Sequence, residues 1–139
     1  MITVPLAQQL HAAGLPWEPA VGDHFAVPGT GLDDHPFVIS EQTAFVQRLN
    51  GVPMIVFHGS TEWALDHVVV GDVVWLPTET QLRMLLDRQL PAPAELRLVR
   101  GSGEYTCTVG TKGDLRSFTA PSGEDAYGMA LLDLLARAN

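Results

Sequence analysis

Apolar positions recur along the chain with two periods, and these periods predict both helices and strands. Apolar residues three or four positions apart predict helices over residues 3–13, 78–89 and 123–137. Thr78 followed by Gln81 matches a capping box, which is typical of a helix start. We therefore expect one helix at the start of the chain, one between two runs of strands and one at the end.

Short apolar runs between turn residues predict the strands. These runs lie at residues 24–27, 36–40, 43–49, 52–57, 73–76, 96–98, 105–109 and 115–119. Asn50-Gly51 predicts a tight hairpin, because both residues tolerate positive φ angles. Residues 59–67 fit a loop, a helical turn or an irregular strand.

The strands follow one another in runs joined by tight turns and do not alternate with helices, which favours an α+β fold. We expect a single domain over residues 1–139. Its mostly antiparallel sheet should have about six to eight strands, with the three helices packed on one face.

A short sequence pattern occurs twice. Residues 21–28 and 70–77 share Val-Gly-Asp followed by four residues and a proline. Gly-Asp favours a turn, the next four residues are mostly apolar, and proline ends strand pairing. The repetition predicts two similar turn-strand units placed alike in one sheet.

Acidic charge is concentrated in the first half of the chain. Residues 1–72 contain eight acidic residues and one basic residue, Arg48, which gives a net charge of −7. Residues 73–139 contain eight acidic and seven basic residues, a net charge of −1. Such a charge distribution repels nucleic acid and anionic membranes and favours a protein partner with a basic surface.

The cysteine content and the apolar runs of the chain narrow the kinds of site that it can form and its expected location. Cys107 is the only cysteine, which excludes an internal disulfide and a cysteine-rich zinc site, and its place in an apolar run predicts a buried, inert thiol. The N-terminal sequence lacks the features of a secretory signal, and no apolar run approaches the roughly 20 residues that span a bilayer. We expect a cytoplasmic protein.

Two groups of residues could carry chemistry. His58, Glu62, Asp66 and His67 lie close together in sequence after an apolar strand, and they could bind a divalent metal or act as an acid-base pair. The alternative for this segment is a connector whose polar groups cap turns.

The second group is a predicted interaction surface. It comprises Asp23, Asp33, Asp34 and Trp63. Asp33-Asp34-His35 could also ligate a cation, although a solvated turn is the simpler interpretation. Trp17, Phe25, Trp63 and Trp75 could line a pocket or an interface, but such aromatic side chains most often belong to the core.

Several segments together resemble a group of small uncharacterised bacterial proteins from high-GC organisms, some of which carry a pilus-assembly label. These segments are Trp17-Glu18-Pro19 with Gly22-Asp23, Leu32-Asp33-Asp34, residues 61–66 and Trp75-Leu76-Pro77. The resemblance covers chiefly residues 1–90 and implies no catalytic residue. The chain also has no nucleotide-binding loop of the kind an assembly ATPase would need.

Neither the motifs nor the composition indicate an enzyme. We expect a non-enzymatic interaction or regulatory module that needs no cofactor, with its acidic binding surface in residues 1–72. The alternative is a small metal-binding protein or metal-dependent enzyme that uses the His58–Asp66 region. An exposed edge strand in the C-terminal sheet could also pair two copies of the chain into a homodimer.

Overall fold

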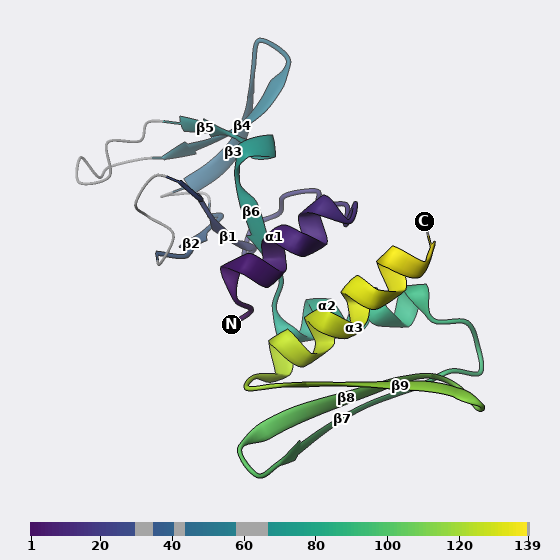
Figure 1. The fold of residues 1–139 in the computed structure, drawn as a ribbon. Coiled ribbons are helices and arrows are strands. Elements are labelled where there is room, and N and C mark those ends of the chain that lie inside the picture. The colour runs from purple at the N-terminus through teal and green to yellow at the C-terminus, as the bar shows by residue number, and fades with distance from the viewer. Residues whose placement is uncertain (30–34, 41–43, 58–66, 139) are drawn as a thin grey trace. The chain divides into compact units, whose positions relative to one another are not determined.

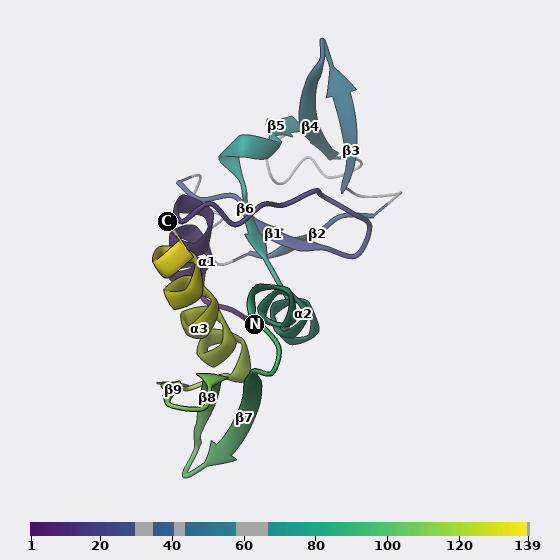
Figure 2. The ribbon, with the colours of Figure 1, turned by 90° about the vertical axis from the view of Figure 1, so that its right-hand side faces the viewer.

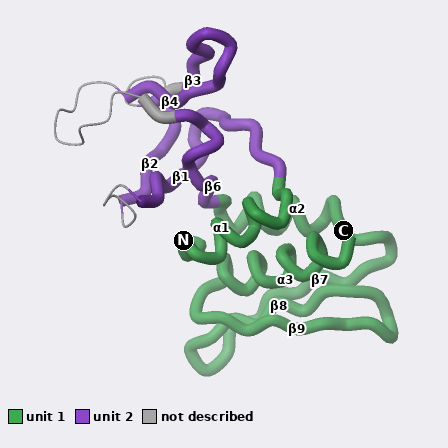
Figure 3. The backbone as a smooth tube through the Cα atoms, turned by 45° about the horizontal axis from the view of Figure 1, so that its top comes forward, with its two compact units in different colours: residues 1–15, 77–139 green, residues 16–76 purple. Residues whose placement is uncertain are grey.

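The computed structural model describes residues 1–29, 35–40, 44–57 and 67–138, which form two units (Figure 3). Unit 1 comprises residues 1–15 and 77–139, and unit 2 comprises residues 16–76. Because residues 1–15 belong to unit 1, unit 2 is an insertion between two parts of unit 1. The expected single domain over residues 1–139 remains a prediction.

The three predicted helices are confirmed, and all of them belong to unit 1. They are α1 (Val4–Ala12), α2 (Glu79–Gln89) and α3 (Gly123–Ala138). The capping box of α2 is present, since Thr78 Oγ1 accepts a hydrogen bond from the Gln81 N–H at 3.2 Å and the Gln81 side chain accepts one from the Thr78 N–H. Ser122 caps α3 by accepting the Asp125 N–H at 3.1 Å.

Unit 1 is built around α3, which lies on the antiparallel sheet β7-β8-β9, named sheet C here (Figures 1 and 2). Its strands are β7 (Glu95–Gly101), β8 (Glu104–Thr111) and β9 (Asp114–Ala120). Helices α1 and α2 pack against α3. The fully buried core includes leucines of all three helices and the thiol of β8, namely Leu10, Leu82, Leu86, Leu131 and Cys107.

Unit 2 contains two further three-stranded antiparallel sheets. Sheet A has the order β2-β1-β6, and sheet B has the order β3-β4-β5. Their strands are β1 (His24–Ala26), β2 (Phe37–Val38), β3 (Ala44–Leu49), β4 (Val52–Phe57), β5 (His67–Val69) and β6 (Val74–Leu76), with the 3₁₀ helix η1 (Val70–Asp72) before β6. The predicted Asn50-Gly51 hairpin joins β3 and β4, with φ angles of 54° and 81°.

The α+β class is therefore confirmed, but the single sheet of six to eight strands is wrong. Within the described residues, the strands are divided among three small sheets, and α3 is the one helix that makes extensive contact with sheet C. Two-residue turns join β3 to β4, β7 to β8 and β8 to β9, so these hairpins form locally and do not require a neighbour from another run. Pro77 follows β6 and the chain enters α2 directly, which separates the strands before α2 from those after it.

The repeated pattern has a clear structural counterpart. The strands of the two copies, β1 and β6, are antiparallel neighbours in sheet A, where Phe25 pairs with Trp75. The prediction of two strands in one sheet is thus confirmed. The turns before them differ, because Gly22 has a φ angle of 95° whereas Gly71 lies in η1 and has no positive φ.

Candidate functional site

The predicted metal group lies mostly outside the described residues. His58, Glu62 and Asp66 fall in the segment that the structure leaves undescribed, and of His67 it describes the backbone, which pairs with Val56. Among the residues that the structure does describe, no three His, Cys, Asp or Glu side chains are grouped as a metal ion would require. The metal site therefore remains a prediction for the undescribed segment.

The predicted interaction surface is also only partly described. Asp33, Asp34 and Trp63 lie outside the described residues, whereas Asp23 is in the turn that leads into β1. Asp23 is buried, with 6% of the residue exposed. A carboxylate buried to this extent has little surface to offer a partner, so the structure gives Asp23 a role inside unit 2 instead.

That role is to hold the turn before β1. One carboxylate oxygen of Asp23, Oδ2, accepts hydrogen bonds from the Trp17 indole N–H at 2.9 Å and from the Ala20 backbone N–H at 3.1 Å. The Asp23 carbonyl oxygen also accepts the Ile39 N–H at 2.9 Å, which continues the pairing of β1 with β2. Hydrogen bonds to a charged acceptor are stronger than neutral ones. Asp23 thereby ties residues 17–23 to sheet A.

Trp17 and Trp75 form the neighbouring part of this arrangement. Their rings are stacked, with centroids 6.0 Å apart and planes at 5° to each other. Phe25 is fully buried and contacts Phe37 at a centroid distance of 5.5 Å and Phe57 at 6.2 Å. These described aromatic side chains pack on or within the core of unit 2, as the more common interpretation of aromatic residues predicted.

Two buried polar atoms of sheet A were not identified from the sequence. Within the described residues, His24 Nδ1 and Trp75 Nε1 have no hydrogen-bond partner. His24 is opposite Leu76 in the β1–β6 ladder, whereas Trp75 is opposite Phe25. Because successive residues of a strand point to opposite faces, these two polar atoms belong to different faces of the sheet.

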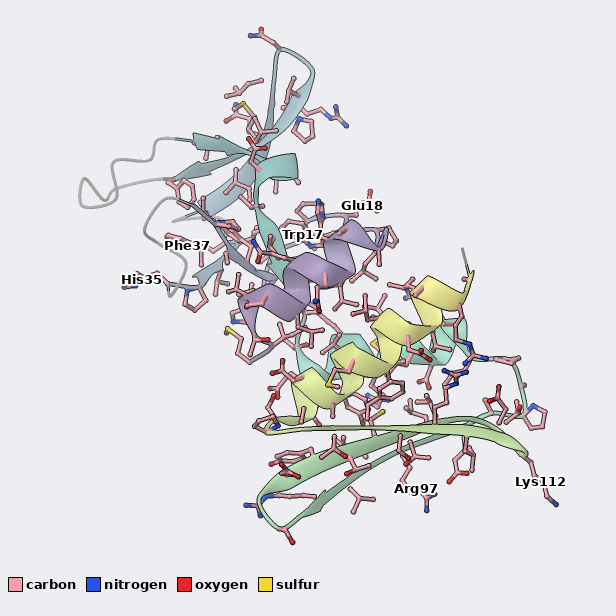
Figure 4. All side chains as sticks on the ribbon, viewed as in Figure 1. Trp17, Glu18, His35, Phe37, Arg97 and Lys112 are labelled. Atoms are coloured by element: carbon pink, nitrogen blue, oxygen red, sulfur yellow. The ribbon has the colours of Figure 1, made fainter. Side chains whose placement is uncertain are left out.

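The two aspartates of the repeated pattern have different environments. Asp23 is buried and hydrogen-bonded, whereas Asp72, at the equivalent position, is exposed in η1. Glu18 follows Trp17 directly and is also exposed (both labelled in Figure 4). Glu18 and Asp72 are the described acidic residues on the surface of unit 2, and this surface is the candidate functional site.

The charge split of the sequence coincides with the division into units. Since residues 1–15 carry no Asp, Glu, Lys or Arg, the net charge of −7 belongs entirely to unit 2, and unit 1 carries −1. The Arg48 guanidinium of unit 2 donates to the Gly51 carbonyl oxygen at 2.9 Å, at its own hairpin turn. In contrast, unit 1 pairs opposite charges, as in Arg97–Glu95 at 2.8 Å and Arg137–Asp114 at 3.2 Å.

Comparisons of the chain with protein-family models, with curated proteins and with solved structures gave no match. The resemblance to small bacterial proteins therefore remains a prediction. In the described part of the chain, no helix has both the length and the apolar character needed to cross a membrane.

Proposed function

We propose that the protein is a non-enzymatic interaction module in which unit 2 binds a basic surface of a partner protein. The observation that carries this proposal is the confinement of the acidic excess to unit 2. Eight acidic residues within 61 positions, with a single arginine among them, create a negative potential that attracts cationic surfaces and repels phosphate backbones. Nucleic acid is thus an unfavourable partner.

The described residues of unit 2 fit this role. Glu18 and Asp72 are exposed, so their carboxylates are free to approach a partner without loss of buried packing. The hydrogen bonds of Asp23 to Trp17 and Ala20 hold the backbone segment that contains Glu18, and a segment that is already ordered loses less conformational entropy on binding. Exposed charges of this kind accelerate association and select partners by charge complementarity.

Zero-length carbodiimide cross-linking is a sharp test, because it joins carboxylates to lysine amines. The chain itself offers two amines, that of Lys112 and the N-terminal amine of Met1, which lies 3.2 Å from Glu124. Links from these two amines are identified by mass and set aside, and the remaining products report a partner. We expect cross-linking of the full chain in its native cells to join carboxylates of unit 2 to lysines of a partner, with mass spectrometry locating the linked residues. Links to a partner protein, as distinct from links between copies of this chain, that arise mainly from acidic residues of unit 1 would contradict the proposal.

A further inference from the structure

Sheet C has two unpaired edges within the described residues, because β8 lies between β7 and β9. An edge strand presents backbone groups that can pair with another strand, and charged side chains commonly prevent this. β7 carries three charged side chains, Glu95, Arg97 and Arg100. β9 carries two, Asp114 and Arg116, both within its first three residues, and the residues from Ser117 to Ala120 are uncharged. The less protected edge is therefore that of β9.

The turn between β8 and β9 determines which backbone groups face this edge. Thr111 and Asp114 pair across a two-residue turn, and in such a turn the flanking residues exchange hydrogen bonds. Hydrogen bonding to one neighbour alternates along an antiparallel strand. The even-numbered residues of β9 then bond to β8, and the N–H and C=O groups of Leu115, Ser117 and Thr119 face outward.

We propose that this edge pairs with β9 of a second copy of the chain, antiparallel about a two-fold axis through Ser117. In this register Ser117 faces its own counterpart and Leu115 faces Thr119, so all three outward-facing residues exchange hydrogen bonds. Arg116 lies opposite Phe118, and no like charges oppose each other. An axis through Arg116 would pair fewer groups and would place two guanidinium groups face to face.

Charges at the two ends of β9 complement each other in this pairing. Lys112 is exposed at the hairpin tip and points away from the sheet (Figure 4), and Glu124 and Asp125 begin α3 beyond the other end of β9. Glu124 pairs with the N-terminal ammonium at 3.2 Å, and Asp125 accepts the Thr3 N–H at 2.9 Å, so the two carboxylates outnumber the one ammonium group there. The antiparallel register places Lys112 of each copy opposite Ser122 of the other, beside these carboxylates. An open groove of about 400 Å³, lined in part by Asp125, lies at this end of β9.

Charge-swap variants test the axis directly. Ser117→Lys and Ser117→Glu each place like charges opposite one another at the axis, so each variant alone should dimerise more weakly, by up to about fivefold, in sedimentation equilibrium. An equimolar mixture of the two should dimerise again. Val99→Lys and Val99→Glu are the matched controls, because Val99 is 53% exposed on the other edge strand, and they should dimerise as the unchanged chain does.

The Ser117 variants also lose an exposed side-chain hydrogen bond with Thr108 at 3.0 Å. Circular dichroism of each variant would therefore be needed to verify that it is folded. A monomer at every concentration of the unchanged chain would overturn the proposal. So would loss of dimers in the Val99 variants with retention in both Ser117 variants.

A carbodiimide cross-link provides an independent measurement. Within one chain, the seven residues of β9, roughly 23 Å in length, separate Lys112 from Glu124. In an isotopically mixed sample of the purified protein, a link between Lys112 and Glu124 or Asp125 should therefore join one labelled and one unlabelled chain. Dimers that lack this link while forming links at other residues would refute the β9 register.

Discussion

Replacing Asp23 with alanine tests whether a buried carboxylate holds unit 2 together. The change removes the acceptor of the Trp17 indole N–H and of the Ala20 N–H. A hydrogen bond to a charged group contributes about 1.5–3 kcal/mol, and the carboxylate itself is costly to bury. We therefore expect a loss of about 2–4 kcal/mol in the free energy of unfolding of unit 2.

The chain supplies a matched control and two separate spectroscopic probes. Asp72 occupies the same position of the repeated pattern but is exposed, so Asp72→Ala should change stability by about 0.5 kcal/mol or less. All three tryptophans lie in unit 2 and the three described helices lie in unit 1. In urea unfolding, tryptophan fluorescence then reports unit 2, and circular dichroism at helical wavelengths reports unit 1.

Asp23→Asn should have an intermediate effect, because its amide oxygen can still accept a hydrogen bond. Equal losses for Asp23→Ala and Asp72→Ala would refute the reasoning. The two probes also test the predicted single domain: Asp23→Ala should shift both transitions together if the units unfold cooperatively, and only the fluorescence transition if they do not.

Three further predictions concern other parts of the chain. Gly110→Ala should destabilise unit 1 by at least about 2 kcal/mol in urea unfolding, because Gly110 has a φ angle of 132° and its added Cβ would lie against a backbone carbonyl of β9. Gly101→Ala should change stability far less, because a Cβ added there has no neighbouring atom within 4 Å. Burial raises the pKa of the Cys107 thiol to about 11 from its ordinary 9.0. The stability that the protonated thiol contributes is therefore complete below pH 9 and is lost as the pH rises through 11. Cys107→Ala should lack this loss, and a variant with the same pH profile as the unchanged chain would contradict the prediction. If the predicted metal site exists, a divalent ion at 100 times its dissociation constant should stabilise the protein by about 2.7 kcal/mol in a thermal melt, and His58→Ala or Asp66→Ala should abolish the shift.

Local signals in the sequence were sufficient for the helices and hairpins. The capping box at Thr78 and the Asn50-Gly51 turn each depend on residues close together in the chain, and the structure contains both. The division of the strands among three sheets depends on pairing between distant segments, such as β1 with β6, which no local pattern specifies. The number of sheets therefore could not be predicted in the same way.

The burial of an individual side chain could not be predicted from the sequence pattern either. Asp23 and Asp72 follow the same Val-Gly dipeptide, yet one is buried and the other exposed. The difference comes from Trp17, six residues before Asp23, whose indole N–H reaches the carboxylate. Charge segregation, in contrast, could be read directly from the sequence, and the structure adds that its boundary coincides with the boundary of unit 2.

The most direct test of the acidic surface compares two double variants that each remove two negative charges. Glu18→Gln with Asp72→Asn changes unit 2, and Asp87→Asn with Glu104→Gln changes exposed positions of unit 1. The measurement is the dissociation constant for the basic partner recovered by cross-linking. The unit 2 pair should weaken binding by about 0.4–2 kcal/mol, roughly 2- to 30-fold, and reduce its salt dependence, while the unit 1 pair leaves both unchanged. Equal effects of the two pairs would contradict a binding surface on unit 2.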